Sequence, residues 1–183
     1  VAAARTVAED RRVHSMHGYF LRAGDATRGM TFAVDRIHDG RPFSTRRSQA
    51  YQDGVPSFSL IASFQRVVPG LEHQIPMPEG VPTPESLPDL EIHLDELDAT
   101  TRLRWDNRPF EFRHVTSPIY KTVEGERVPS QMVWMRARRR LPDDPQLHRA
   151  ALAYASDSTI QESILRAHGL AWVTDGLNVA SLD

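Results

Sequence analysis

MTFAVDRIHDGRPFSTRRSQAYQDGVPSFSLIASF, residues 30–64, is the stretch that decides the fold. Apolar residues alternate with polar ones in Met30–Val34 and again in Phe58–Phe64, and a period of two residues is typical of half-buried strands. Asp39-Gly40 and Asp53-Gly54 lie between these strands, and Asp-Gly is a signature of type I′ hairpin turns. With the segment between the two turns as a third strand, the stretch predicts an antiparallel meander.

The residues before the meander add one helix and one strand. Val1–Glu9 is rich in alanine and predicts a helix. Val13–Leu21 is rich in strand formers and ends at Gly24-Asp25, which predicts a fourth strand. The first part of the chain is therefore one helix followed by four strands.

The segment from Pro69 to about Asp89 has the composition of a linker. It has no regular apolar pattern, and its chain-breaking residues are Pro69, Gly70, Pro76, Pro78, Gly80, Pro82, Pro84 and Pro88. The acidic segment Leu90–Leu97 that follows is either a short surface helix or an extension of this linker.

A second block of regular structure follows the linker. Phe110 and Phe112 alternate with charged residues in a short strand, and Gln131–Arg140 is a second strand. In this second strand Trp134 and Arg136 share one face, while Val133, Met135 and Ala137 share the other. Leu177–Leu182 predicts a last strand.

One long helix is predicted inside the second block, over Pro145–Leu165. Asp144 is a suitable N-cap for Pro145 at the first helical position, and Leu147, Ala151 and Tyr154 form an apolar stripe. Ser158 with Gln161 predicts a capping box that restarts the helix, and His168-Gly169 ends it. The pattern therefore predicts an α+β fold with two similar halves, each a helix packed on an antiparallel sheet.

Composition excludes several classes of function. The formal net charge of -2 gives no electrostatic footprint for nucleic acid, and the absence of Cys excludes disulfides and thiolate catalysis. No apolar run is long enough to span a membrane, and no signal peptide is evident, so we expect a cytoplasmic protein. We expect no cofactor and no metal. Because Val1 reads as mid-helix and Asp183 as mid-strand, we expect the chain to be part of a longer polypeptide.

A series of short motifs, in order along the whole chain, resembles the thioesterase II family of acyl-CoA thioesterases. These motifs are Val13–Arg22 with Gly24-Asp25; Asp39-Gly40-Arg41 with Phe43, Arg46 and Arg47; Gln52, Gly54 and Ala62–Gln65; Tyr154–Asp157; and Val179–Asp183. The resemblance implies a double hotdog, in which each unit is a long helix wrapped by a curved antiparallel sheet, incomplete in this chain. It implies a first repeat in residues 1–68, a linker in 69–104 and a second repeat in 105–183.

The resemblance also implies hydrolysis of fatty acyl-CoA to a free acid and CoA. In this family an Asp, a Thr or Ser, and a Gln of the second repeat hold and activate a water, and only the Asp matches this chain, at Asp183. A carboxylate is suited to take the proton of an attacking water. The residue pattern alone leaves open that Asp183 merely ends a strand. No substrate-binding residue is predicted.

Ser15 aligns with Asp183 when Tyr19, Phe20 and Arg22 are matched to the motif that follows the catalytic Asp in the family. The first repeat would then lack the carboxylate and act as a structural partner. On a strand, His17 points to the same face as Ser15 and His14 to the opposite face, so His17 is the one neighbour that could activate Ser15. For the same reason His14 and His17 are not expected to hold one metal ion.

Two arginine clusters and one aspartate have alternative interpretations. The cluster Arg136, Arg138, Arg139 and Arg140, and the pair Arg46-Arg47, would suit the phosphates of CoA or would be solvated strand-edge charges. Asp157 would be either a buried contact to the catalytic strand or, as we favour, a helix-terminal cap.

Two other functions compete with the thioesterase. A hotdog dehydratase or hydratase usually needs an Asp and a His close in sequence, and no clear match is found. A non-catalytic acyl-binding protein remains open because two of three catalytic positions are not in the chain. The expected partners are the acyl-CoA substrate and, from the family, further copies of the chain in a homo-oligomer.

Overall fold

The computed structural model describes residues 1–89 and 106–177. The chain divides into two compact units, each described by itself. Among the described residues, the first unit contains Val1–His73 and Asp143–Ala150, and the second contains the described part of Gln74–Pro142 together with residues 151–177.

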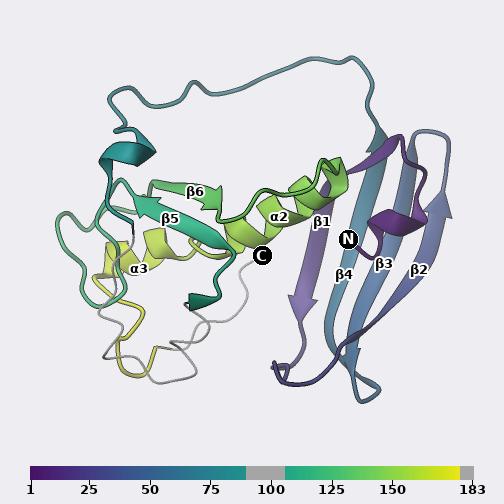
Figure 1. Ribbon diagram of the computed structural model, residues 1–183, viewed down its shortest axis with the longest axis horizontal. Coiled ribbons are helices and arrows are strands. Elements are labelled where there is room, and N and C mark those ends of the chain that lie inside the picture. Colours follow the sequence, from purple (N-terminus) through teal and green to yellow (C-terminus); the bar gives the residue numbers. More distant parts are fainter. Residues whose placement is uncertain (90–105, 178–183) are drawn as a thin grey trace. The chain divides into compact units, whose positions relative to one another are not determined.

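The first unit is built on a four-stranded antiparallel sheet (Figure 1). Its strands are β1 (Arg11–Phe20), β2 (Thr31–Asp39), β3 (Phe43–Gln52) and β4 (Val55–Arg66), in the order β1-β4-β3-β2. The predicted meander of three strands is therefore confirmed, and the strand that precedes it pairs with the last strand of the meander.

The two Asp-Gly turns differ in conformation. Asp53 and Gly54 both have positive φ, 50° and 77°, as a type I′ turn requires. At Asp39-Gly40 the predicted hairpin is confirmed, since β2 and β3 are antiparallel, but the predicted type I′ turn is wrong, because neither residue has positive φ. The amide of Gly40 donates to the carbonyl of Phe43 at 2.9 Å. The carboxylate of Asp39 instead accepts hydrogen bonds from Ser44 and Arg46, at 2.6 and 2.7 Å, and this longer turn is held by side chains.

The predicted helix over Val1–Glu9 is reduced to one short 3₁₀ turn, η1 (Ala4–Thr6). Val7 is already extended, at φ -108° and ψ 164°. The guanidinium of Arg46 donates to both the carbonyl and the hydroxyl of Thr6, at 3.0 and 2.9 Å, so the carbonyl that would continue the helix is taken. The segment still packs on the sheet, because Ala3 is buried against Ala62 and Phe64.

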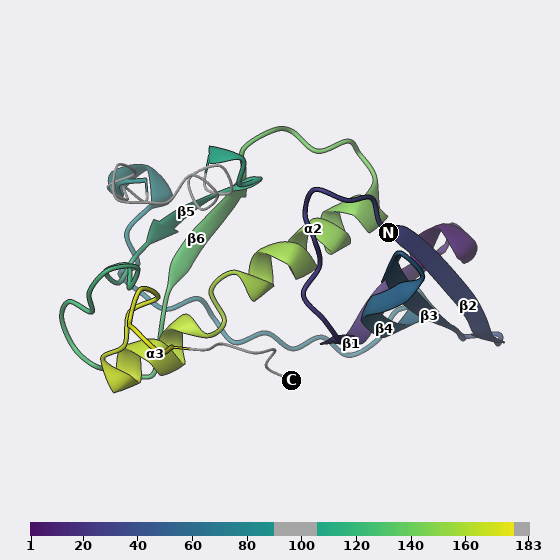
Figure 2. The same ribbon diagram turned by 90° about the horizontal axis from the view of Figure 1, so that it is seen from below.

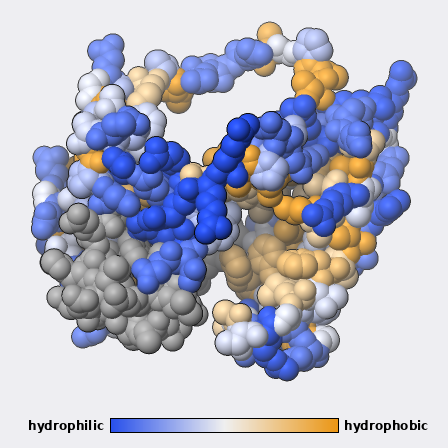
Figure 3. All heavy atoms as spheres, viewed as in Figure 1, coloured by the Kyte–Doolittle hydropathy of each residue, from blue (hydrophilic) through white to orange (hydrophobic). Residues whose placement is uncertain are grey.

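The apolar face of this sheet is only partly covered. Phe64 and Ala62 are buried, but Met16, Phe20 and Phe32 are 52, 65 and 57 % exposed. Figure 3 shows hydrophobic residues gathered over the strands of this unit. Phe32 was expected to be one of the buried residues of a half-buried strand β2. This expectation is wrong, because Phe32 lies on the part of the face that is not covered.

The second unit pairs a short hairpin with two helices. β5 (Phe110–His114) and β6 (Val133–Ala137) are antiparallel, and β6 is shorter than the predicted Gln131–Arg140. Phe110 and Phe112 are buried against Ala155 of α2 (Pro145–Asp157). A short 3₁₀ turn, η2 (Pro84–Ser86), lies in the proline-rich segment.

The predicted helix of the second half is largely confirmed, with a break. Asp144 caps α2, since its carboxylate accepts from the amide of Gln146 at 2.8 Å. α2 ends at Asp157, and α3 (Glu162–His168) follows after one irregular turn, visible in Figure 2. The predicted capping box is wrong, because Gln161 is the N-cap and makes no capping side-chain bond. Gly169 ends α3 in the left-handed conformation, at φ 68°, as predicted.

No helix within residues 1–89 and 106–177 is long and apolar enough to cross a membrane.

Candidate functional site

Three predicted features lie outside the described residues. These are Asp183, the predicted last strand before it, and the acidic segment Leu90–Leu97. Of that strand only Leu177 is described.

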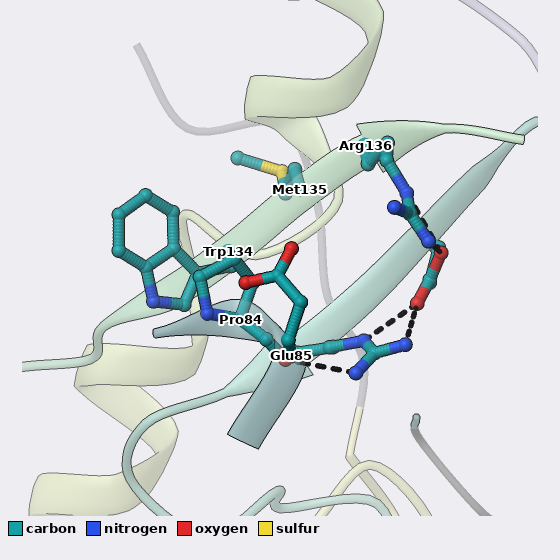
Figure 4. Close-up of a pocket in the computed structure, with 7 residues that line it drawn as sticks. Pro84, Glu85, Trp134, Met135 and Arg136 are labelled. Atoms are coloured by element: carbon teal, nitrogen blue, oxygen red, sulfur yellow. Dashed lines mark hydrogen bonds and ion pairs between the residues drawn. The ribbon is translucent and has the colours of Figure 1, made fainter. Parts of the chain in front are cut away.

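A pocket of about 480 Å³ lies on the hairpin of the second unit (Figure 4). The hairpin contributes Glu111 and Arg113 from β5 and Trp134, Met135 and Arg136 from β6, and the η2 turn contributes Pro84 and Glu85. The volume is in the range of small-molecule sites in proteins.

Glu111 joins two arginines in the wall of this pocket. One carboxylate oxygen accepts from Arg113 at 2.5 Å, and the other accepts from Arg136 at 2.5 and 3.0 Å. The hydrogen bonds from Arg136 and then from Arg113 lower the pKa of Glu111 below its ordinary value. The three charges therefore largely satisfy one another and hold the two strands together.

The η2 turn is tied to the hairpin by two side chains. Arg113 donates to the carbonyls of Pro84 and Leu87, both at 2.8 Å. The indole nitrogen of Trp134 donates to the carbonyl of Pro82 at 3.0 Å. The end of the predicted linker is thus part of the second unit and forms one side of the pocket.

A buried polar pair joins the end of β5 to the start of α3. His114 Nε2 and Glu162 Oε2 are 3.0 Å apart, and their side chains are 2 and 0 % exposed. The edge of the His114 ring packs near Tyr120, with ring centroids 6.0 Å apart. Burial, and then the charge of Glu162, raise the pKa of Tyr120, so its hydroxyl stays protonated at neutral pH.

Arg166 fixes the loop between β5 and β6 to α3. It is 2 % exposed and donates to Gln131 Oε1 at 2.9 Å, to the carbonyl of Glu124 at 3.1 Å, and to the carbonyl of Ser117. The amide of Trp172 donates to the carbonyl of Ile119 at 3.0 Å, which ties the chain after α3 to the same loop. These contacts define the path of the chain for several residues before the predicted catalytic strand.

The residues predicted around Ser15 lie on the exposed edge strand β1. Ser15 pairs with Ser63 of β4, and His17 pairs with Ile61. A bulge at His14 shifts the register, and His14 Nε2 contacts Ser63 Oγ at 2.9 Å. Among the described residues no group of three His, Asp or Glu side chains is placed to hold a metal ion.

The two arginine clusters have different roles. Arg46 is 1 % exposed and internally bonded, so it is a structural residue, whereas Arg47 forms an exposed ion pair with Asp35 at 2.8 Å. Arg136 forms an ion pair with Glu111, and Arg138 Nη2 lies 3.5 Å from Asp89 Oδ2. Asp157 is exposed at the end of α2, so it is not a buried contact, and the favoured role as a cap for the next helix is not found either, because Gln161 is the N-cap of α3.

Sequence reasoning missed the pocket, the buried pair and Arg166. The alternation in β6 does place Trp134 and Arg136 on one face, but Glu111 and Glu85 belong to separate segments of the chain. His114 and Glu162 are 48 residues apart, so no local pattern connects them.

Comparison with known proteins agrees with this fold. Residues 1–65 match the family model described as acyl-CoA thioesterase N-terminal domain, and residues 104–183 match that of acyl-CoA thioesterase. Human acyl-coenzyme A thioesterase 8 is 37 % identical over 182 residues, which cover 92 % of this chain and 56 % of the human protein. The chain therefore spans about half the length of this relative.

Solved structures of the same kind are similar in three dimensions. The acyl-CoA thioesterase II TesB2 from Mycobacterium marinum superposes with a TM-score of 0.68 at 39 % identity, covering 91 % of this chain and 58 % of that one. A protein from Alicyclobacillus acidocaldarius described as having a hot dog fold superposes with a TM-score of 0.60 at 16 % identity, covering 79 % of this chain and 50 % of that one. At this identity the likeness is one of fold alone. With its α+β hotdog fold and the order of its motifs, the chain belongs to the thioesterase II family of acyl-CoA thioesterases.

Proposed function

We propose that the whole protein hydrolyses fatty acyl-CoA thioesters to free fatty acid and CoA, with Asp183 activating the attacking water. The observation that carries the proposal is the match of both halves of the chain to acyl-CoA thioesterase models. The relatives named as acyl-CoA thioesterases support the same reaction.

The chemistry assigned to Asp183 follows from the demands of thioester hydrolysis. A water becomes nucleophilic when a carboxylate takes its proton, and the developing oxyanion needs fixed hydrogen-bond donors. The residues beyond this chain would supply the Thr or Ser and the Gln that complete such a site. We further propose that residues 1–68 and 105–183 are the two hotdog repeats and that residues 69–104 link them.

The substrate and the setting are part of the same proposal. The partner is acyl-CoA, the protein forms homo-oligomers, and its location is the cytoplasm.

The test replaces Asp183 in the full-length protein and follows release of CoA from a long-chain acyl-CoA. We expect Asp183→Asn to lower kcat by about 100-fold or more with an unchanged melting temperature, because the amide keeps the shape and removes the base. Asp175→Asn is the matched control, since Asp175 is an exposed aspartate eight positions earlier. An Asp183→Asn enzyme with the wild-type rate would refute the role of Asp183.

A wild-type protein that binds acyl-CoA without hydrolysing it would favour the acyl-binding alternative. Addition of water to an enoyl-CoA, with no thioester cleavage, would favour the hydratase.

A further inference from the structure

The pocket on the β5–β6 hairpin has a defined chemical character once its internal bonds are taken into account. The indole N–H of Trp134 donates its hydrogen bond to the carbonyl of Pro82, so Trp134 offers a ligand only its aromatic face. Pro84 and Met135 add further apolar surface to the lining. A flat, partly apolar ligand would be complementary to this part of the pocket.

Two polar groups of the pocket remain available to a ligand. Both carboxylate oxygens of Glu111 accept hydrogen bonds from arginines, and Arg113 donates to Glu111 and to two backbone carbonyls. Glu85 accepts no hydrogen bond from any described residue, and its side chain is exposed in the η2 turn. Arg136 uses Nε and Nη2 for Glu111, which leaves Nη1, and its side chain is 67 % exposed.

These groups are separated in the pocket rather than paired with each other. In the view of Figure 4, Trp134 lies at one end, the Arg136 guanidinium at the other, and the Glu85 carboxylate between them. The ligand must therefore offer a planar ring, a hydrogen-bond donor for Glu85 and an acceptor for Arg136.

Other ligand classes fit this set less well. An acyl chain would leave the Glu85 carboxylate against apolar atoms, which is unfavourable. A lone phosphate would meet arginines whose donors are largely used by Glu111 and by two backbone carbonyls, and it would be repelled by Glu85.

We propose that this pocket binds the base of an adenine nucleotide. Adenine is planar, its amino group donates a hydrogen bond, and its ring nitrogens accept hydrogen bonds. The base would stack on Trp134, donate to Glu85 and accept from Arg136. Arg139, exposed just beyond β6, is a basic group near this end of the hairpin for the phosphates.

Two sources carry this chemistry, namely the nucleotide end of CoA and a free nucleotide such as ADP. The first source rests on the proposed function, because it makes the pocket part of substrate binding. The binding itself does not depend on that function and is measured separately.

The first experiment measures binding of ADP and of inosine diphosphate to the full-length protein by calorimetry. Hypoxanthine has a carbonyl where adenine has the amino group, so the hydrogen bond from that position to Glu85 is lost, and only the neighbouring ring N1–H can donate. We expect ADP to bind about tenfold more tightly than inosine diphosphate. Glu85→Gln, which can donate to the carbonyl, should abolish or reverse this preference, while the exposed control Glu79→Gln keeps it.

The stacking contact is tested in the same assay. Trp134→Ala should weaken ADP binding about tenfold, whereas Trp134→Phe, which keeps an aromatic face, should stay within about threefold of wild type. Circular dichroism melting verifies that each variant is folded. The proposal is overturned if neither nucleotide binds at millimolar concentration, or if Glu85→Gln leaves the ratio of the two affinities unchanged.

The second experiment identifies the source, with the full-length protein. If the nucleotide is that of CoA, Trp134→Ala should raise KM for an acyl-CoA relative to KM for the same acyl group on pantetheine, which lacks the nucleotide. If it is a free nucleotide, ADP should change the rate of hydrolysis of the wild type and should lose this effect in Trp134→Ala. Wild-type protein that binds ADP but hydrolyses no thioester would refute the proposed function and leave the nucleotide site standing.

Discussion

Arg46 makes five hydrogen bonds while it is 1 % exposed. Its partners are the hydroxyl and carbonyl of Thr6, the carbonyls of His38 and Thr45, and the carboxylate of Asp39. A buried guanidinium is stable only when its donors are satisfied in this way. Because Thr6 is 40 residues away in sequence, no spacing rule could distinguish Arg46 from its neighbour Arg47.

Replacing this residue conservatively should be costly. An amine cannot reproduce the planar, divergent donors of a guanidinium, so Arg46→Lys should lower the free energy of unfolding by about 2–4 kcal/mol. Urea unfolding followed by circular dichroism measures the change. Arg47→Lys is the matched control and should cost about 0.5 kcal/mol or less, since its ion pair with Asp35 is exposed. Equal effects of the two substitutions would show that burial of Arg46 is unimportant.

Ser15 and His17 are predicted to be dispensable for turnover. Both lie on the exposed strand β1, and a serine hydroxyl does not ionise near neutral pH without an activating partner. Ser15→Ala and His17→Ala should each leave kcat for a long-chain acyl-CoA within about threefold of wild type in the full-length enzyme. If either abolishes turnover without changing the melting temperature, the first repeat takes part in the chemistry.

The break between α2 and α3 shows how a buried contact overrides a local helix pattern. Sequence places a capping box at Ser158 and Gln161, but the carboxylate of Glu162 is taken by His114. Gln161, the N-cap, makes no side-chain bond, and Glu162, the first residue of α3, is held instead by His114 of β5. Apolar periodicity could predict that Pro145–Leu165 is largely helical, and it could not predict where this contact interrupts it.

The β5–β6 hairpin should lose stability in acid. The pKa of Glu111 is held below its ordinary value of 4.5 by Arg136 and Arg113. A depressed carboxylate contributes stability that is complete above its unfolded pKa and is lost as pH falls through its folded pKa. We therefore expect the urea concentration at the unfolding midpoint to decrease as the pH falls below about 4.5. This decrease in acid, the acid limb, should be smaller in Glu111→Gln.

The measurement is urea unfolding from pH 7 to pH 3, followed by far-ultraviolet circular dichroism. Glu126→Gln is a suitable control, because Glu126 is an exposed carboxylate of the same unit. An acid limb in Glu111→Gln as steep as that of the wild type would count against the role of Glu111.

At the scale of the whole molecule, the segment after β4 stands out among the described residues for its exposure to solvent. Val67, Leu71 and Ile75 are 73, 108 and 79 % exposed, and Arg66 is the last residue of the sheet before them. Extended, exposed chain is the preferred substrate of proteases. We expect limited thermolysin digestion of the 183-residue chain to cut first between Val67 and Met77, as mass spectrometry would reveal. A first cut inside β3 or β4 would contradict this prediction.

The sequence predicts most of the architecture of the chain and little of its local chemistry. Strand alternation, Asp-Gly turns and the capped helix suffice for an α+β fold with two similar halves, and the motifs suffice for the family. The pocket around Trp134 and the networks of Arg46 and Arg166 join residues far apart in sequence, so they depend on packing that no local pattern encodes. The role of Asp183 remains a prediction.

The Asp53-Gly54 turn gives the protein a defined point of chemical ageing. An aspartyl carboxyl followed by glycine is attacked by the unhindered glycine amide nitrogen, and the cyclic imide reopens mostly as isoaspartate, with one extra carbon in the main chain. Asp53 is 58 % exposed, and the two-residue turn leaves no slack between Gln52 and Val55, which pair directly. Long storage would therefore lengthen the backbone inside the two-residue turn that joins β3 directly to β4.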